Sequence, residues 1–285
     1  DLVRSRGLGD VYKRQVLDYV FIFPLGMGMF GAALATCVAP CIGILISSTH
    51  FLRGKNSFRP VRCPLNGKQA RGILSLGVSS LITEVSSGIV MLLFNQILLS
   101  LSGNVGVAAY GIIANLALIV ISIFTGVAQG IQPIVSRSFG SGQMRHVKQI
   151  FHYGVITAVA FGLLFLGIGW FFSQPIVGIF NQENNLEMER LASQGLPLYF
   201  LAFPMMGVNI LASSYLASLS KGGPAFVLSV LRGAAAVIPA VLLLSRLFGI
   251  TGVWLAVPCA EALTFLVFLA MLPFCFRRPQ KGAGA

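Results

Sequence analysis

One ionisable side chain stands alone in a long apolar stretch of this sequence. Glu84 is the only charged residue between Gly72 and Ser100. A carboxylate in the middle of a membrane span is costly unless a proton, a cation or a partner compensates it. We therefore interpret Glu84 as a binding group for a proton, a coupling cation or a cationic substrate. A structural, hydrogen-bonded carboxyl is the alternative, and Asn95 on the same predicted helix is a polar partner.

Two further apolar segments also carry acids. Asp18 precedes a short turn and Thr36 follows it, so a helical hairpin can bring the carboxylate and the hydroxyl together. Such a pair suits a proton relay or a hard cation, and we consider Na⁺ for Asp18 and Thr36. Glu261 lies in another apolar segment, with Arg232 in the segment before it. Glu261 is interpreted either as half of a structural ion pair with Arg232 or as a functional group.

Soft and aromatic side chains gather around one proline. Met205 and Met206 follow Pro204, Tyr199 precedes it, and Asn209 is the polar candidate in the same segment. Flexible Met side chains can form an adaptable wall for varied hydrophobic ligands, and lipid-facing filler is the alternative interpretation. Because proline removes a helical hydrogen bond, Pro204 also predicts a bend.

Membrane-spanning helices must position these residues. Of 285 residues, 56% are hydrophobic and only 10% are charged, whereas a soluble domain carries about 25% charged residues. A water-soluble enzyme is therefore excluded. Stretches of about 20 mostly apolar residues predict spans, which must be helical because unpaired backbone groups are not tolerated in lipid. The predicted spans are 28–52, 72–100, 107–136, 150–175, 195–219, 224–247 and 250–275, preceded by the end of another at 16–23.

The basic residues collect in alternate loops, which explains the net charge of +12 without a nucleic-acid partner. One side holds the loops 53–71 and 137–149, Lys221 and the tail 277–285, whereas the other holds only Arg190 and Arg246. The positive-inside rule makes the first side, and the C-terminus, cytoplasmic. The acidic stretch 182–190 then faces outward.

Other motifs fail in their context. A G-x-G-x-x-G match at 26–31 leads into a membrane span and lacks the acid expected about 20 residues later, so a dinucleotide site is rejected. The five cysteines form no C-x-x-C pair, so neither a zinc site nor a disulfide framework is predicted. Residues 1–15 are polar and basic and resemble translated adapter sequence. We treat 1–15 as a non-native leader and the chain as a fragment.

Several segments together resemble the multidrug and toxic compound extrusion (MATE) family, in its bacterial multidrug branch. They are Val16–Asp18, Phe21–Phe23, Gly31–Thr36, Ile82–Glu84, Leu93–Asn95 and Gly130–Ser136. The resemblance implies an all-α polytopic membrane protein with twelve helices in two six-helix lobes. This chain would supply the end of helix five and helix six (16–52), a cytoplasmic inter-lobe loop (53–71), the complete second lobe (72–276) and a cytoplasmic tail (277–285). The small-residue run Gly31–Ala35 parallels Gly252–Ala256, as in an internal repeat.

The resemblance also implies residue roles. Asp18 and Thr36 match the family's first-lobe cation and proton site, and Glu84 matches a helix-seven glutamate used for second-lobe ion or substrate binding. Some members carry a helix-ten aspartate, but 195–219 contains no acid and Asn209 is the nearest polar candidate. This departure favours Glu84 acting on protons or cationic drugs rather than in a second-lobe Na⁺ site.

The expected function follows from that resemblance. It is a monomeric secondary antiporter of the bacterial inner membrane, with no cofactor and no enzymatic activity, that exports cationic amphiphilic compounds in exchange for H⁺ or Na⁺. Candidate cavity residues are Glu84, Asn95, Tyr199, Met205, Met206, Asn209 and Glu261. A lipid-precursor flippase of the same superfamily is the alternative, although its anionic pyrophosphate substrate needs a more cationic cavity. A seven-helix receptor fits the number of complete spans.

Overall fold

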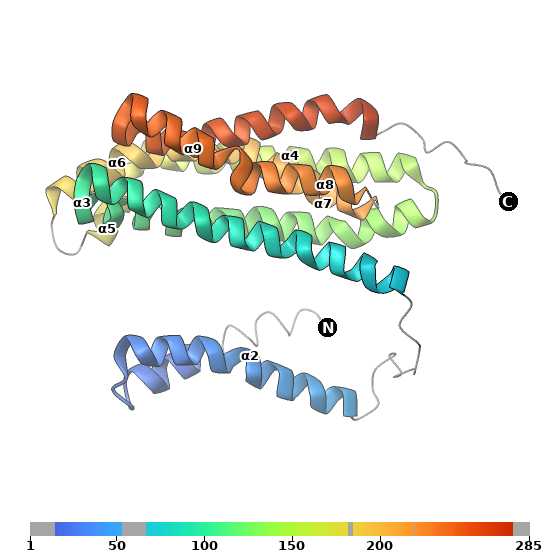
Figure 1. Ribbon diagram of the computed structural model, residues 1–285, viewed down its shortest axis with the longest axis horizontal. Coiled ribbons are helices and arrows are strands. Elements are labelled where there is room, and N and C mark those ends of the chain that lie inside the picture. Colours follow the sequence, from blue (N-terminus) through green and yellow to red (C-terminus); the bar gives the residue numbers. More distant parts are fainter. Residues whose placement is uncertain (1–14, 53–66, 182–184, 220, 276–285) are drawn as a thin grey trace. The chain divides into compact units, whose positions relative to one another are not determined.

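The computed structural model describes residues 15–52, 67–181, 185–219 and 221–275, and the side chains at 46, 47, 50–52, 68–84 and 273–275 lie outside the description. Every regular element within these ranges is a helix, as the sequence predicts (Figure 1). The chain divides into two compact units, residues 1–66 and 67–285. Each unit is described by itself.

The first unit is a helical hairpin. Residues 15–22 are helical, and helix α2 runs from Gly28 to Leu52, which confirms the predicted span 28–52. The connection is tight, because the amides of Leu25 and Met27 donate to the carbonyls of Val20 and Phe21. Asp18 and Thr36 therefore lie on the two arms of one hairpin.

The second unit is a bundle of long apolar helices. Its elements are α3 (Gly67–Gly140), α4 (Met144–Phe171), α5 (Ser173–Phe180), α6 (Leu186–Phe200), α7 (Phe203–Ser218), α8 (Gly222–Val230), the π-helical turn η1 (Leu231–Ala235) and α9 (Val237–Cys275). Both α3 and α9 contain a break, at Gly103 (φ 63°, ψ −155°) and Gly249 (φ 58°, ψ −133°). The two parts of α3 correspond to the predicted spans 72–100 and 107–136. In the same way, α8 through α9 corresponds to 224–247 and 250–275.

By length and composition, four described helices can cross a membrane, and the bent pair α6–α7 adds a fifth span. Two of these four candidate stretches contain the glycine breaks at Gly103 and Gly249. α6 and α7 meet at 48°, just before Pro204, which confirms the predicted bend. The described part of the chain is therefore an all-α polytopic membrane protein.

The later part of the acidic stretch 182–190 is helical rather than a loop. Helix α6 already begins at Leu186, so the predicted span 195–219 starts too late. The side chain of Asn185 caps this helix by accepting from the amides of Glu187 and Met188, both at 3.1 Å. Glu187 and Glu189 lie in the first turn, where carboxylates stabilise the positive end of the helix dipole. The Asn185 cap and the first-turn carboxylates stabilise the N-terminus of α6, so the helix begins before its apolar part.

Three helical hairpins have the same Gly-x-x-Gly spacing in their turns, at 28–31, 103–106 and 249–252. The first glycine of each has positive φ, where residues with a Cβ are disfavoured. A Cβ on the second glycine would meet the preceding helix. Its nearest neighbour would be the carbonyl oxygen of Phe21 at 2.9 Å for Gly31, Cβ of Ser102 at 2.8 Å for Gly106, and the carbonyl oxygen of Leu244 for Gly252. The parallel between Gly31 and Gly252 is thus one of geometry as well as sequence.

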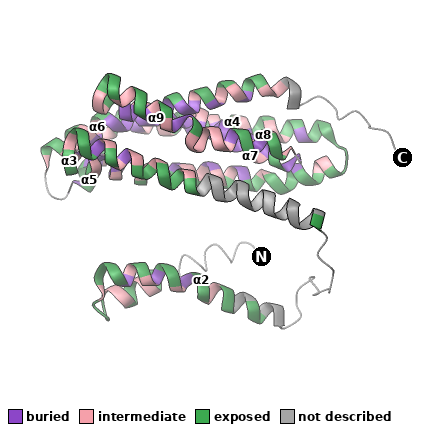
Figure 2. Cartoon of the chain, in the orientation of Figure 1, coloured by how far each residue is buried: buried purple, intermediate pink, exposed green. Residues whose placement is uncertain are grey.

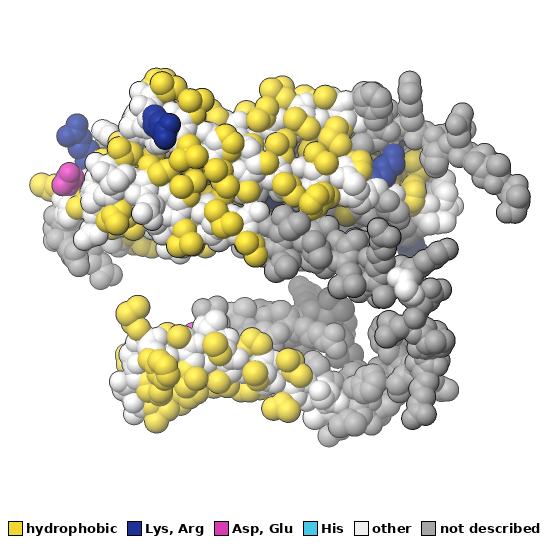
Figure 3. All heavy atoms as spheres, in the orientation of Figure 1, with side chains coloured by type: hydrophobic (Ala, Val, Ile, Leu, Met, Phe, Trp, Pro, Cys, Tyr) yellow, Lys and Arg dark blue, Asp and Glu magenta, His cyan; other side chains and the backbone are white. Residues whose placement is uncertain are grey.

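Apolar side chains occupy both the interior and the surface of the second unit. Trp254, Tyr215, Phe94, Phe124 and Phe203 are fully buried between helices, and Figure 2 shows the buried residues along the inner faces. Large apolar side chains such as Leu163, Trp170 and Phe248 remain more than half exposed. On the face drawn in Figure 3, hydrophobic and uncharged side chains predominate among the described residues. Such an exterior suits a lipid environment.

A buried carboxylate between three helices

The described part of the second unit contains a buried acid held by two donors. Glu261, on α9, is 2% exposed. Arg232 donates from Nε to Oε1 of Glu261 at 3.3 Å. Asn209, on α7, donates from Nδ2 to Oε2 of Glu261 at 2.7 Å and to its backbone carbonyl at 2.9 Å. The contact between Arg232 and Glu261 confirms that these residues pair across elements, and Asn209 is an additional partner that the sequence does not predict.

A local irregularity of the helix positions the arginine. Arg232 lies in the π-helical turn η1, between α8 and α9. A π-helical turn is wider than an α-helical one, and such insertions occur frequently at functional sites. The Arg232 side chain is 24% exposed. The guanidinium therefore approaches Glu261 while part of the side chain remains accessible at the surface of this unit.

Asn209 lies at the most enclosed part of the bundle. The residue is 0% exposed, and neighbouring Gly207 allows Phe124 of α3 to pack directly against the α7 backbone. The Oδ1 atom of Asn209 is buried without a hydrogen-bond partner. A buried acceptor without a donor is costly, so this oxygen is available to a proton donor or a cation.

Aromatic side chains surround the polar cluster. Tyr199 of α6 is 7% exposed and belongs to the same buried apolar cluster as Tyr110 of α3 and Ala260, the neighbour of Glu261. Tyr110 stacks between Phe94 and Trp254, with ring centroids 5.2 and 6.4 Å away. An apolar aromatic wall strengthens electrostatic interactions inside the cluster, because little water screens them.

The cluster pairs one buried carboxylate with one internal cation. Arg232 and Asn209 each donate to one of the two carboxyl oxygens of Glu261. Protonation of Glu261, or approach of another cation, removes the charge that holds Arg232. The site therefore has the elements of a competition between an internal arginine and an external cation.

The other predicted site residues fall into different environments. Met206 and Tyr199 are buried in the core, so lipid-facing filler is wrong for both, and Met205 and Asn95 are half-buried. Thr36 is exposed and its Oγ1 donates to the carbonyl of Ala32 at 3.0 Å, while Asp18 is half-buried. Glu84 lies within helix α3, but its side chain is outside the described residues. Among the described residues, no group of three or more His, Cys, Asp or Glu could hold a metal ion.

Comparison with known proteins identifies the family of this helical bundle. The MatE family model matches residues 77–244, which is more than half of the chain. This chain belongs to the MatE family. Membership places the MatE chain among membrane transporters rather than enzymes, and it sets aside the seven-helix receptor.

Relatives of the MatE chain are named multidrug export proteins. It is 26% identical to the multidrug export protein MepA of Staphylococcus aureus over 271 residues. This alignment covers 93% of the chain and 58% of MepA. MepA of Staphylococcus haemolyticus is 27% identical over 266 residues, covering 93% of the chain and 57% of that protein. The MatE chain thus spans somewhat more than half the length of these relatives.

Solved structures share the fold of the MatE chain. A multidrug resistance MATE family transporter of the MOP superfamily, in an outward-facing conformation, matches with a TM-score of 0.82 and 17% identity, covering 93% of this chain and 60% of that one. The Vibrio cholerae MATE transporter VcmN in its bent form matches with a TM-score of 0.75 and 20% identity, covering 94% of this chain and 60% of that one. The helices of both units therefore follow a known transporter architecture.

Proposed function

We propose that this chain is part of a secondary active antiporter of the bacterial inner membrane, which exports cationic amphiphilic compounds in exchange for H⁺ or Na⁺. Family membership and the names of the MepA relatives support multidrug export. The described structure adds one observation about charge. A carboxylate is buried in the apolar second unit, where it attracts cations and repels anions.

The proposed mechanism is a competition for carboxylates. A carboxylate that binds either a proton, a metal cation or a cationic drug links the movements of these species, because one removes the charge that attracts another. At Glu261, Arg232 occupies the carboxylate, so a proton or another cation would have to compete with this arginine. Because Arg232 is neutralised by Glu261, the cluster offers no excess positive charge to an anionic pyrophosphate. The cluster therefore lacks the excess positive charge that the lipid precursor of a flippase would need.

Three further residues complete the proposal. Asp18 and Thr36 would bind the coupling ion in the first lobe, and Glu84 would bind a proton or a cationic drug in the second. The hairpin that carries Asp18 and Thr36 on its two arms is consistent with a joint role. Glu84 lies on α3, which packs against the elements that carry Asn209 and Arg232. Alternating access would require a first lobe of six helices, of which this chain carries the last part.

The test is drug efflux by the transporter with its upstream helices restored from the flanking coding sequence. Glu84→Gln and Glu261→Gln keep the side-chain volume but remove the charge. We expect ethidium efflux from energised cells to fall at least about fivefold, the lower end of typical site-to-site coupling. Glu187→Gln is the matched control, because Glu187 is exposed in the first turn of α6. Efflux at the wild-type rate in both test variants, at equal expression, would refute the carboxylate competition.

A further inference from the structure

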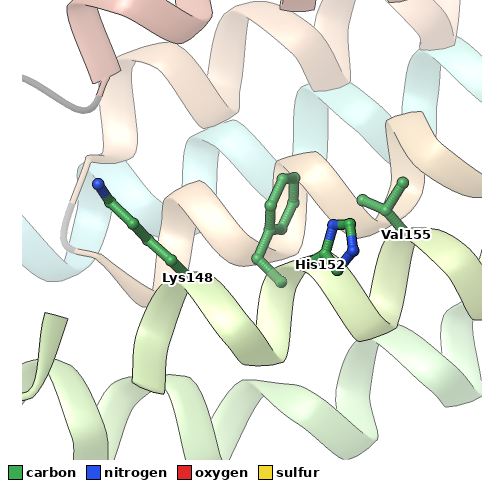
Figure 4. Close-up of a pocket in the computed structure, with 4 residues that line it drawn as sticks. Lys148, His152 and Val155 are labelled. Carbon is green, nitrogen blue, oxygen red and sulfur yellow. The ribbon is translucent and has the colours of Figure 1, made fainter. Parts of the chain in front are cut away.

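A separate cavity lies along the first half of α4, away from the cluster around Glu261. It is a shallow depression that lies widely open at the surface, with a volume of about 480 Å³, and it is lined by Lys148, Phe151, His152 and Val155 of α4 (Figure 4). Residues three and four apart share one face of a helix, so these four side chains form one strip. In Figure 4 the Lys148 side chain extends toward one end of the strip and Val155 lies at the other. The cavity is therefore cationic at one end and apolar beyond it.

Aromatic packing fixes the inner wall of this cavity. Phe151 lies against Tyr215 of α7, with ring centroids 4.2 Å apart, and meets Phe268 of α9 edge-on at 6.2 Å. Phe151 and Val155 also pack against a buried apolar cluster formed by α7, α8 and α9. Because α7 and α9 support this α4 strip from behind, the strip remains in place when the cavity is empty, so a ligand need not create its own site.

Helix α4 places the cationic end at the level of lipid headgroups. From Lys148 the helix continues to an exposed aromatic group at Trp170, Phe171 and Phe172. The 22 residues between Lys148 and Trp170 extend about 33 Å, close to the hydrocarbon thickness of about 30 Å. Trp side chains are enriched at membrane interfaces, so with Trp170 at one interface Lys148 would reach the opposite one. His152 then lies one turn deeper, at the level of the glycerol esters.

The charge around this end has one sign among the described residues. Lys148 and His152 are both exposed, and Arg145 lies one turn before Lys148 on the same face. The last turn of α3 adds Arg137, brought to the same end by the short connection to α4. The described carboxylates of this unit lie elsewhere, with Glu187 and Glu189 in the first turn of α6 and Glu261 inside the bundle. An anionic headgroup complements this end, whereas a zwitterionic one gains little.

We propose that this cavity binds an anionic phospholipid. Its phosphate pairs with Lys148, its ester oxygens accept from His152, and one acyl chain covers Phe151 and Val155. The lipid would tie α4 to α7 and α9 at one interface and stabilise the second unit. This inference does not depend on the proposed antiport, because lipid binding is measured without transport.

The test is native mass spectrometry of the full transporter in detergent with added phosphatidylglycerol or phosphatidylcholine. We expect retention of phosphatidylglycerol over phosphatidylcholine. Lys148→Ala should weaken phosphatidylglycerol binding about fivefold, the effect of one basic residue at an anionic headgroup, without changing phosphatidylcholine binding. Arg137→Ala is the matched control, since it removes a positive charge at the same end but outside the cavity.

A second variant distinguishes lipid binding in the cavity from general electrostatic attraction of anionic lipids to the basic residues around Lys148. Val155→Phe fills the apolar part and leaves every charge in place, so it should also weaken phosphatidylglycerol binding while the melting temperature stays close to wild type. Inorganic phosphate added in excess should not displace the lipid, because it lacks the acyl chain. Equal losses in Lys148→Ala and Arg137→Ala, equal binding of the two lipids, or displacement by phosphate alone would each overturn the proposal.

Discussion

At the scale of single residues, Glu261 is held by two donors of unequal character. Arg232 supplies a full charge at 3.3 Å from a partly exposed position, whereas Asn209 supplies a neutral donor at 2.7 Å from a fully enclosed one. The neutral bond is the shorter of the two. Arg232 is therefore the partner that can leave without opening the bundle, and Asn209 keeps the carboxylate oriented.

Removing the arginine charge should destabilise the protein. Arg232→Gln leaves an uncompensated buried carboxylate, and breaking a buried ion pair from one side costs about 3 kcal/mol, the lower end of the usual range because Arg232 is partly exposed. The measurement is thermal unfolding of the purified transporter in detergent. Adding Glu261→Gln to Arg232→Gln should recover most of the loss, because no buried charge then remains. Exposed Arg246 gives the control Arg246→Gln, and an equally small effect of both single arginine variants would contradict a structural ion pair.

The sequence predicts part of this cluster, for a physical reason. Charged residues are rare inside apolar segments, so an ion pair with Arg232 is one of the two interpretations of Glu261 that the sequence offers. Asn209 is noticed only as a polar candidate, because its contact with Glu261 depends on how α7 and α9 pack in space. The π-helical turn around Arg232 has no comparable signal, since Leu231–Ala235 is ordinary helix-forming sequence.

At the scale of elements, glycines decide where helices break and how closely they approach. The sequence shows Gly31 and Gly252 as a weak internal match, but the shared Gly-x-x-Gly turn at 103–106 is overlooked among the many glycines of the chain. A positive φ and a close backbone approach are geometric properties that only the structure shows. Single glycines are common in this chain, so a pair spaced as Gly-x-x-Gly does not stand out in the sequence. The spans are predicted well because apolar length is a direct physical requirement of the bilayer.

The packing of α4 on α7 gives a test with an internal control. A Cβ on Gly162 would lie 2.5 Å from Cα of Pro204, in the backbone of α7, whereas a Cβ on Gly167 would meet nothing within 4 Å. Gly162→Ala should therefore cost about 1–3 kcal/mol through overpacking. Gly167→Ala should leave stability unchanged or raise it by up to about 1 kcal/mol, from helix propensity. Thermal unfolding of the two variants measures the difference, and similar melting temperatures would show that α4 does not pack closely there.

At the scale of the whole molecule, most of the described basic residues of the second unit lie at the end opposite to Glu187 and Glu189. Arg137, Arg145, Lys148 and Lys221 lie near the short connections α3–α4 and α7–α8, whereas the first turn of α6 carries Glu187 and Glu189. A chain crossing the bilayer with this asymmetry is oriented by its basic loops. The bundle geometry sets which residues share an end, but the direction of insertion follows from charge alone.

Cysteine accessibility tests this orientation. Ser141→Cys lies in the α3–α4 connection at the basic end, and Leu186→Cys lies at the start of α6, where Leu186 is 80% exposed. In a background with the native cysteines replaced, a membrane-impermeant maleimide added to intact spheroplasts should label Leu186→Cys and leave Ser141→Cys unlabelled until the membrane is permeabilised. This expectation follows from the positive-inside rule, by which the end that carries Arg137, Arg145 and Lys148 would face the cytoplasm. The reverse labelling pattern would invert the topology, and with it the direction in which the proposed cation exchange at Glu261 moves its substrate.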